Sequence, residues 1–288
     1  MPIDPLLSGL ITALEDVPGL TAIVLGGSRA RGTARDTSDY DIGLYFSAAS
    51  RLDTTWLREA MRKHVDDPDS FDVTEIGDWG PWIIGGAWLT IEGRKVDLLY
   101  RDTDGVARVI DECRAGQIGM HYQPGHPHGF CSAIWMGEVA LCEPLHDPTA
   151  KIRRLKAATS PYPMALRTAL IRRFRWEILF SIENAELAIS RGDQTHIAGC
   201  AYRALACAGQ ILFAVNECYL INEKGAMEQA ATFPLTVPNL MERVASIWRQ
   251  LGNSEFKPAF ELLRGIAQEL SALIDQHRSL LTRTTKLP

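Results

Sequence analysis

The pattern of apolar and polar positions divides the chain into two halves of different character. In the first half, short apolar runs alternate with turns rich in Gly, Pro and Asp, which is typical of strands and short helices. Strands are expected at residues 21–25, 42–46, 71–76, 87–91 and 94–100. After Pro148, apolar residues recur at helical spacing almost to the end of the chain, which predicts a helical second half.

The same periodicity predicts helices among the strands and throughout the second half. Asp4 is the expected N-cap of the first helix, residues 4–16, with Pro5 at its first helical position. A helix at residues 51–65 is expected to cover one face of the sheet. Further helices are expected at residues 102–117, 164–191, 195–221, 234–251 and 255–281, and those at 164–191 and 195–221 should pack as an antiparallel pair.

Composition narrows the class of protein. The 288 residues allow one large domain or two, and a hydrophobic content of 46% is sufficient for sizeable cores. A net charge of −5 weighs against a general nucleic-acid binder. The six cysteines form no C-x-x-C pair and no zinc spacing, so a reducing cytoplasm is the expected location. No signal peptide and no membrane span are expected, because neither pattern is visible.

Most of the candidate chemistry lies in one stretch, which reads L-G-G-S-R-A-R-G-T-A-R-D-T-S-D-Y-D-I-G-L-Y-F. Gly26 and Gly27 let backbone N–H groups approach an anion, and the short helix expected after Ser28, to about Arg35, adds its dipole. Asp39 and Asp41 stand two residues apart on an extended chain, so they point to the same side and can share two divalent cations about 3.5–4 Å apart. One end of the stretch therefore suits phosphate and the other suits Mg²⁺.

A third carboxylate, Asp97, stands between apolar residues in the predicted strand 94–100. Strand, Gly-Gly-Ser, helix, Asp-x-Asp, strand and an Asp on a later strand together resemble the signature of the DNA polymerase beta-like nucleotidyltransferase superfamily. The resemblance covers approximately residues 20–101. It implies that Asp39, Asp41 and Asp97 are the catalytic residues and the ligands of two Mg²⁺ ions.

The resemblance also implies a fold and a domain organisation. The expected fold class is α+β, with a catalytic nucleotidyltransferase domain containing a mixed sheet at residues 1–147. A helical, substrate-binding bundle would follow at residues 148–288, and the acceptor would lie in the cleft between the two. This layout is similar to that of antibiotic-modifying nucleotidyltransferases, whose substrates are aminoglycosides and lincosamides.

Several residues are candidates for binding the nucleotide. Gly27 and Ser28 would hold a terminal phosphate, and Arg29 either contacts the triphosphate or belongs to a solvated turn. Residues 148–176 contain eight Lys and Arg and no acidic residue. Such a run is usually a solvated face, but related enzymes place a basic residue of the helical domain near the outer phosphates. Lys151 and Arg154 are the candidates for that role.

The identity of the general base remains open. One Mg²⁺ held by all three aspartates would lower the pKa of the acceptor hydroxyl, and a second, held by Asp39 and Asp41, would bind the triphosphate. Asp97 is an alternative general base. So are Glu177 and Glu183, because kanamycin-type nucleotidyltransferases use a glutamate from that region.

Aromatic residues and histidines offer further possibilities. Trp79, Trp82 and Trp88 are either core residues or, near the site, aromatic groups that stack on a nucleobase. His126 and His128 lie in an irregular loop that either borders the acceptor pocket or packs structurally. A zinc site there would lack nearby residues to complete four ligands.

The predicted function is Mg²⁺-dependent transfer of a nucleoside monophosphate from a nucleoside triphosphate to a hydroxyl acceptor. The acidic net charge favours a small acceptor such as an aminoglycoside or lincosamide, with no membrane partner. The alternative is an enzyme acting on tRNA or protein, including as a toxin–antitoxin component. A catalytically inactive regulatory module is a third class, which the complete set of Ser28, Asp39, Asp41 and Asp97 disfavours. The sequence does not specify which nucleotide is used.

Overall fold

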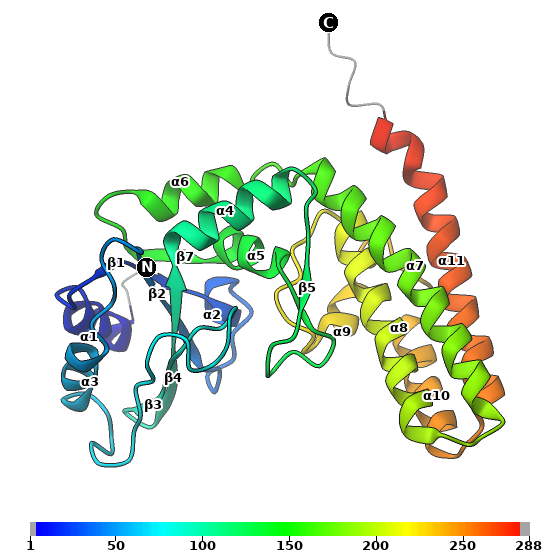
Figure 1. The fold of residues 1–288 in the computed structure, drawn as a ribbon, viewed down its shortest axis with the longest axis horizontal. Coiled ribbons are helices and arrows are strands. Elements are labelled where there is room, and N and C mark those ends of the chain that lie inside the picture. The colour runs from blue at the N-terminus through cyan, green and yellow to red at the C-terminus, as the bar shows by residue number, and fades with distance from the viewer. Residues whose placement is uncertain (1–3, 283–288) are drawn as a thin grey trace, which may run out of the picture. The chain divides into compact units, whose positions relative to one another are not determined.

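The computed structural model describes residues 4–282 of the chain. Within that range the chain forms two compact units (Figure 1). The first contains the residues up to Glu112 together with Met120–Gly125 and Gly129–Pro161, and the second contains Cys113–Gly119, His126–His128 and the chain from Tyr162 onward. The chain passes between the units more than once, so packing divides it differently from the predicted domains, residues 1–147 and 148–288.

A five-stranded mixed sheet forms the centre of the first unit. Its strand order is β3-β4-β2-β1-β7; β2 and β4 are parallel, and the other neighbouring pairs are antiparallel. The elements in chain order are α1 (Pro5–Leu14), β1 (Leu20–Leu25), α2 (Gly27–Ala30), β2 (Tyr40–Phe46), α3 (Thr54–Arg62), β3 (Gly86–Ile91), β4 (Arg94–Asp102), α4 (Thr103–Arg114), β5 (Met120–His121), β6 (Phe130–Cys131), α5 (Ala133–Leu141), β7 (Glu143–His146) and α6 (Lys151–Ala158). The predicted class, a mixed sheet followed by helices, is confirmed.

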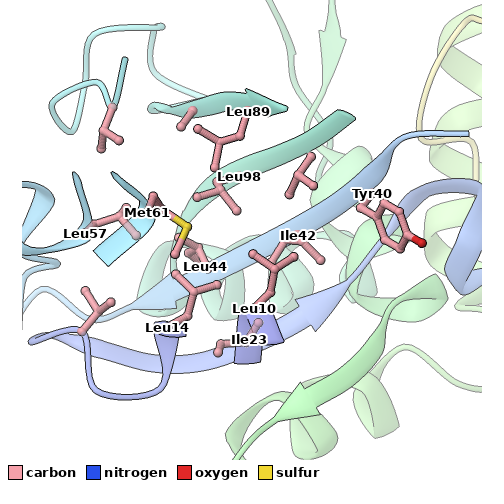
Figure 2. Packing of buried hydrophobic residues seen from close by; sticks show 14 of the residues in the cluster. Leu10, Leu14, Ile23, Tyr40, Ile42, Leu44, Leu57, Met61, Leu89 and Leu98 are labelled. Atoms are coloured by element: carbon pink, nitrogen blue, oxygen red, sulfur yellow. The ribbon is translucent and has the colours of Figure 1, made fainter. Parts of the chain in front are cut away.

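One face of the sheet packs against α1 and α3, which lie side by side (Figure 1). Alternate residues of each strand point to this face, because successive side chains of a strand point to opposite sides. Ile42 and Leu44 of β2 and Leu98 of β4 are completely buried there. They belong to one apolar cluster with Leu57 and Met61 of α3 (Figure 2). The prediction that the second helix covers one face of the sheet is therefore confirmed.

Asp4 ties the start of α1 to the sheet. Its Oδ1 accepts a hydrogen bond from the backbone N–H of Leu6 at 3.0 Å, as expected of an N-cap. Its Oδ2 accepts a hydrogen bond from the hydroxyl of Tyr40, and that hydroxyl accepts one from Nη1 of Arg94. The bond from Tyr40 lowers the pKa of Asp4. These contacts hold together the first residues of α1, β2 and β4.

A two-residue turn, Glu92-Gly93, joins β3 to β4 as predicted. Both residues have positive φ, 53° and 71°, which matches the twist of an antiparallel pair. The carboxylate of Asp66 accepts hydrogen bonds from the N–H groups of Glu92 and Gly93 at 2.7 and 2.8 Å. The turn is thus held at its tip, and the resulting register places Trp88 opposite Asp97.

The predicted strand at residues 71–76 is wrong. In the structure this segment forms only an isolated bridge between Val73 and Ala87. Arg58 of α3 donates one hydrogen bond to the carboxylate of Asp72 at 2.8 Å and another to the carbonyl of Val73 at 2.6 Å. The segment is therefore held between α3 and the start of β3, where Thr74 bonds to Gly86, and it does not continue as a strand.

The second unit is helical. Its helices are α7 (Met164–Ile189), α8 (Gln194–Val215), α9 (Ala226–Ala231), α10 (Leu240–Gly252) and α11 (Phe256–Thr282). The predicted pair of long helices, α7 and α8, makes the most extensive contact between any two elements. The predicted helix at residues 234–251 begins later, at Leu240, and α9 precedes it as a separate short helix.

By length and composition, α8 could cross a membrane, although no such segment was expected. Two observations explain its character. It contacts α7, α9 and α11, and 67% of its most apolar window is buried inside the unit. An apolar helix that is buried by its neighbours on most sides is typical of a bundle core.

Replacing Asp4 by Ala is expected to lower the free energy of unfolding by about 1–2 kcal/mol at pH 7, because both the N-cap and the partner of Tyr40 are lost. Because the pKa of Asp4 is lowered in the folded protein, this stabilisation is present above the unfolded-state pKa and is lost as pH falls through the folded-state pKa. Urea denaturation of both proteins between pH 7 and pH 2.5 measures the difference. Asp16→Ala, at an exposed position after the same helix, is the control.

Candidate active site

Asp41 and Asp97 are brought together by the parallel pairing of β2 with β4. They are register partners, and their neighbours Ile42 and Leu98 are also partners. Ile42 and Leu98 point into the core, so Asp41 and Asp97 must both point to the opposite face of the sheet. Both are partly exposed. Two carboxylates from separate segments of the chain therefore lie side by side, as the sequence predicted.

The same face of the sheet is covered farther along β4. Arg101 projects to this face, four residues after Asp97, and is almost completely buried. Its Nε and Nη2 donate to the two carboxylate oxygens of Glu138 on α5, each at 2.8 Å. This bidentate pair fixes α5 over that end of the face.

Asp39 lies immediately before β2 and is exposed. The position of its segment is set by Arg29, which projects from α2. The guanidinium of Arg29 donates to the carbonyl of Ser38 at 2.6 Å and to that of Asp39 at 3.2 Å. It also lies 3.7 Å from the centre of the Tyr40 ring. The structure thus gives Arg29 a positioning role toward the Asp39 segment, and its predicted contact with the triphosphate stays a prediction.

The two glycines lie directly against Asp41. The N–H of Gly26 donates to the carbonyl of Asp41 at 2.7 Å. Gly27 has a φ of +60°, and a Cβ at this position would overlap the carboxylate of Asp41. Only glycine satisfies both conditions, so the backbone of the Gly-Gly-Ser turn and the carboxylate are packed together.

Ser28 follows in α2, which is much shorter than predicted. The helix was expected to reach about Arg35 but ends at Ala30. Gly32 adopts a φ of +68° and its N–H bonds to the carbonyl of Arg29, which closes the turn. A helix of four residues contributes little dipole, so any anion here would be bound by the local N–H groups and the serine.

The carboxylates suit a hard divalent cation. Carboxylate oxygens such as those of Asp41 and Asp97 are the ligands that Mg²⁺ prefers. Because Gly27 has no side chain, the carboxylate of Asp41 can lie directly against the backbone of the glycine turn. Among residues 4–282, no three His, Cys, Asp or Glu side chains are gathered closely enough to hold a metal ion in their present positions. The structure brings Asp41 and Asp97 together and leaves Asp39 as an exposed third carboxylate, two residues before Asp41 in the chain.

Lys151 and Arg154 are not brought to this pair of carboxylates. The Nζ of Lys151 bonds to Asp104 at 2.9 Å, and Asp104 follows the carboxyl end of β4, whereas Asp97 lies within the strand. Arg154 Nη1 donates to the carbonyl of Thr149, just before its own helix. The predicted binding of outer phosphates by these two residues stays a prediction that these contacts do not favour.

The glutamates considered as general bases lie in the second unit. Glu177 is buried, and its oxygens pair with Arg173 at 3.1 Å and with Arg203 at 2.7 Å. Both oxygens of this carboxylate are therefore already occupied by guanidinium groups, which leaves neither open to an acceptor hydroxyl. Glu183 is exposed on the surface of α7.

The histidine loop is anchored within the second unit. Glu223 accepts the backbone N–H of His128 at 3.3 Å, and its other oxygen lies 3.1 Å from Nδ1 of His126. His128 is buried, and burial lowers its pKa, so the imidazole is neutral near pH 7. Its Nε2 lies 3.9 Å from the Sγ of Cys207. No zinc cluster forms there among the described residues, and the contacts support a structural role.

Sequence reasoning did not single out Trp88 as a neighbour of Asp97. The alternation of side chains along β3 could have indicated its position. Ala87, Leu89 and Ile91 face the core and are buried, whereas Trp88 between them is exposed. Trp88 is therefore on the same face of the sheet as its register partner Asp97.

Comparison with known proteins identifies the first part of the chain. Residues 7–112 match the nucleotidyltransferase domain family, and this range contains Gly27, Ser28, Asp39, Asp41 and Asp97. Among solved structures, a nucleotidyltransferase-like protein from Exiguobacterium sibiricum is similar over 92% of this chain and 71% of that chain, with 12% identity and a TM-score of 0.41. No curated protein matches the chain.

The domain match confirms the predicted enzyme class, a nucleotidyltransferase that takes a nucleoside triphosphate as substrate. Domains of this family typically use a divalent metal.

Replacing Arg29 by Ala is expected to loosen the segment before β2, because the carbonyls of Ser38 and Asp39 lose their donor. Amide hydrogen exchange at residues 36–39 should accelerate by about tenfold, which corresponds to the loss of about 1.4 kcal/mol of local stability. Arg35→Ala, in the same segment, is the control. Unchanged exchange in Arg29→Ala would show that other contacts hold the segment.

Proposed function

We propose that the nucleotidyltransferase domain moves a nucleoside monophosphate from a nucleoside triphosphate to a hydroxyl group of a small molecule, of the aminoglycoside or lincosamide type. The observation that carries this proposal is the register pairing of Asp41 with Asp97 beside the Gly26-Gly27 turn. Carboxylates that hold metal and a glycine turn that offers backbone N–H groups to phosphate are the two parts that a metal–triphosphate complex requires.

Two Mg²⁺ ions, held by Asp39, Asp41 and Asp97, would neutralise charge on the triphosphate and increase the acidity of the acceptor hydroxyl. Gly27 and Ser28 would bind the outer phosphates through backbone N–H groups and the serine hydroxyl. Gly26, bonded to the backbone of Asp41, keeps this turn at a fixed place relative to the carboxylates. The protein thus supplies alignment and charge, which phosphoryl-type transfer chiefly requires.

The reaction breaks one bond and forms one. The acceptor oxygen attacks the α-phosphorus, the bond from that phosphorus to the bridging oxygen breaks, and pyrophosphate leaves with the bonding electron pair. The proton of the acceptor hydroxyl leaves to water, because Asp97 would be engaged with metal and Glu177 is already paired with two arginines.

The charges of the second half favour a small acceptor over a nucleic acid. Of the eight basic residues at 148–176, five pair with carboxylates, and these pairs are Lys151–Asp104, Arg153–Asp147, Arg167–Glu217, Arg173–Glu177 and Arg175–Asp275. Lysine and arginine side chains that are neutralised within the protein offer little attraction for phosphate backbones. A run of basic residues could by itself bind RNA, but most of the positive charges in this run are paired with carboxylates of the same chain.

Replacing Asp41 by Asn is expected to lower kcat/KM for transfer by at least about a thousandfold, because one carboxylate charge at the reacting phosphate is lost. The assay incubates the protein with each labelled nucleoside triphosphate, Mg²⁺ and a panel of aminoglycosides, lincosamides, tRNA and protein. Asp97→Asn should have an effect of similar size. EDTA should abolish transfer, and added Mg²⁺ should restore it.

Asp36→Asn is the matched control, because Asp36 is exposed in the same segment as Asp39. Circular dichroism and the urea midpoint establish that each variant is folded. Full activity of folded Asp41→Asn would refute the site. Transfer to tRNA or to protein, with none to small molecules, would replace the proposed acceptor by the alternative class, including a toxin–antitoxin role.

A further inference from the structure

Two tryptophans form a stacked pair on the open part of the sheet face. The rings of Trp79 and Trp88 have centroids 4.4 Å apart and planes inclined by 18°. Trp88 is nevertheless 68% exposed. A large aromatic ring covered on one side by a second ring and left open to solvent elsewhere offers a flat apolar surface to a ligand.

This pair lies next to the proposed reacting centre. Trp88 is the register partner of Asp97 across the β3–β4 pair, and Asp97 is the register partner of Asp41. The three residues therefore lie in one row across the sheet on the same face. Side chains directly opposite on neighbouring antiparallel strands have Cβ atoms about 4.5–5.5 Å apart, so Trp88 is in direct reach of Asp97.

The loop that carries Trp79 is held in place by a buried side chain. Gln123 is 2% exposed, and its Nε2 donates to the carbonyl of Trp79 at 2.7 Å. Its Oε1 accepts from the N–H groups of Trp82 and Ile83, each at 3.2 Å. Three hydrogen bonds from one buried amide fix the loop, so the ring of Trp79 is positioned before any ligand arrives.

Packing beneath the pair has the same effect. Gly86 lies at the start of β3, and a Cβ there would overlap the carbonyl of Leu98 and come within 3.0 Å of the Trp79 ring. The absence of a side chain at this position lets Trp79 lie against the strand next to Trp88.

The order of strands indicates which substrate meets this pair. Across the sheet, β1 is followed by β2, β4 and β3. The glycine turn that would hold the outer phosphates follows β1, and Trp88 is on β3, with the carboxylates between them. In an in-line displacement the attacking oxygen approaches opposite the leaving pyrophosphate. With pyrophosphate on the β1 side, the acceptor approaches from the β3 side.

We propose that Trp79 and Trp88 form the acceptor platform, on which a hydroxylated ring of the acceptor stacks so that its hydroxyl points to Asp97. This inference rests on the proposed function. An amino-sugar ring suits the platform, because its C–H face is apolar and its ammonium groups are attracted to the negative face of an indole. The pair is thus a specificity-determining element, separate from the carboxylates that carry out the reaction.

The first test separates the two substrates kinetically, with kanamycin and lincomycin as acceptor probes. Trp88→Ala should raise the KM of the acceptor by about tenfold, which corresponds to the loss of a ring contact of ordinary strength. The KM of the nucleoside triphosphate should change by less than about twofold, since that substrate is bound elsewhere. Trp88→Phe, which keeps an aromatic face, should recover most of the loss.

Trp56→Ala is the matched control, because Trp56 is a partly exposed tryptophan on α3, across the sheet from Asp97. It should leave both KM values unchanged. A raised KM for the nucleoside triphosphate in Trp88→Ala would overturn the proposal and assign the platform to the nucleobase. An unchanged acceptor KM, or an effect seen with tRNA alone, would also overturn it.

The second test is independent of catalysis. Calorimetric titration of Asp41→Asn with kanamycin and lincomycin should show binding of at least one probe, and the double variant Asp41→Asn/Trp88→Ala should lose it. Such a loss supports the platform even where the transfer assay fails for every acceptor, in which case only the proposed function falls. Absence of binding by both probes overturns the platform as an amino-sugar site.

Discussion

The parallel pairing of β2 with β4 is the constraint on which the proposed site depends. Register partners on neighbouring parallel strands point to the same face of the sheet. The pairing of β2 with β4 therefore determines the positions of Asp41 and Asp97 together. A shift of one residue would move Asp97 to the core face, where a carboxylate would be buried among Leu and Ile. Burial of Ile42 and Leu98 therefore keeps Asp41 and Asp97 on the opposite face of the sheet. The hydrophobic core selects the register, and the register brings the carboxylates together.

The contacts around this pairing hold its ends. Tyr40, completely buried at the start of β2, connects the N-cap of α1 with Arg94 at the start of β4. Arg29 reaches from the glycine turn to the segment before β2, and Asp66 holds the turn between β3 and β4. None of these side chains needs to touch a substrate. Their common effect is to reduce the freedom of segments that carry exposed polar groups, which is what a site assembled from loops and strand ends requires.

Much of the fold could be predicted from the sequence, because its signals are local. Asp4-Pro5 marks a helix start and Glu92-Gly93 marks a hairpin, and both depend on neighbouring residues only. The segment at 71–76 has strand-like composition but is held by Arg58 of α3, a contact that no local pattern reveals. Within the site, the grouping of Asp41 with Asp97 followed from the motif. The partners of Lys151 and Arg29 did not, since a charged side chain finds its partner through the tertiary fold. The stack of Trp79 on Trp88 likewise depends on Gln123, far away in sequence.

The passage of the chain between the two units has a consequence for how such a protein can be divided or recombined. His126–His128 belongs to the second unit although it lies before the long helices in sequence, and its partner Glu223 follows α8. A polypeptide that stopped at residue 147 would retain His128 but lose Glu223 and Cys207, so an imidazole made for a dry interior would be transferred to water. The helical half is therefore not a self-sufficient gene segment, because Cys113–Gly119 and His126–His128 of its unit are encoded within the catalytic half.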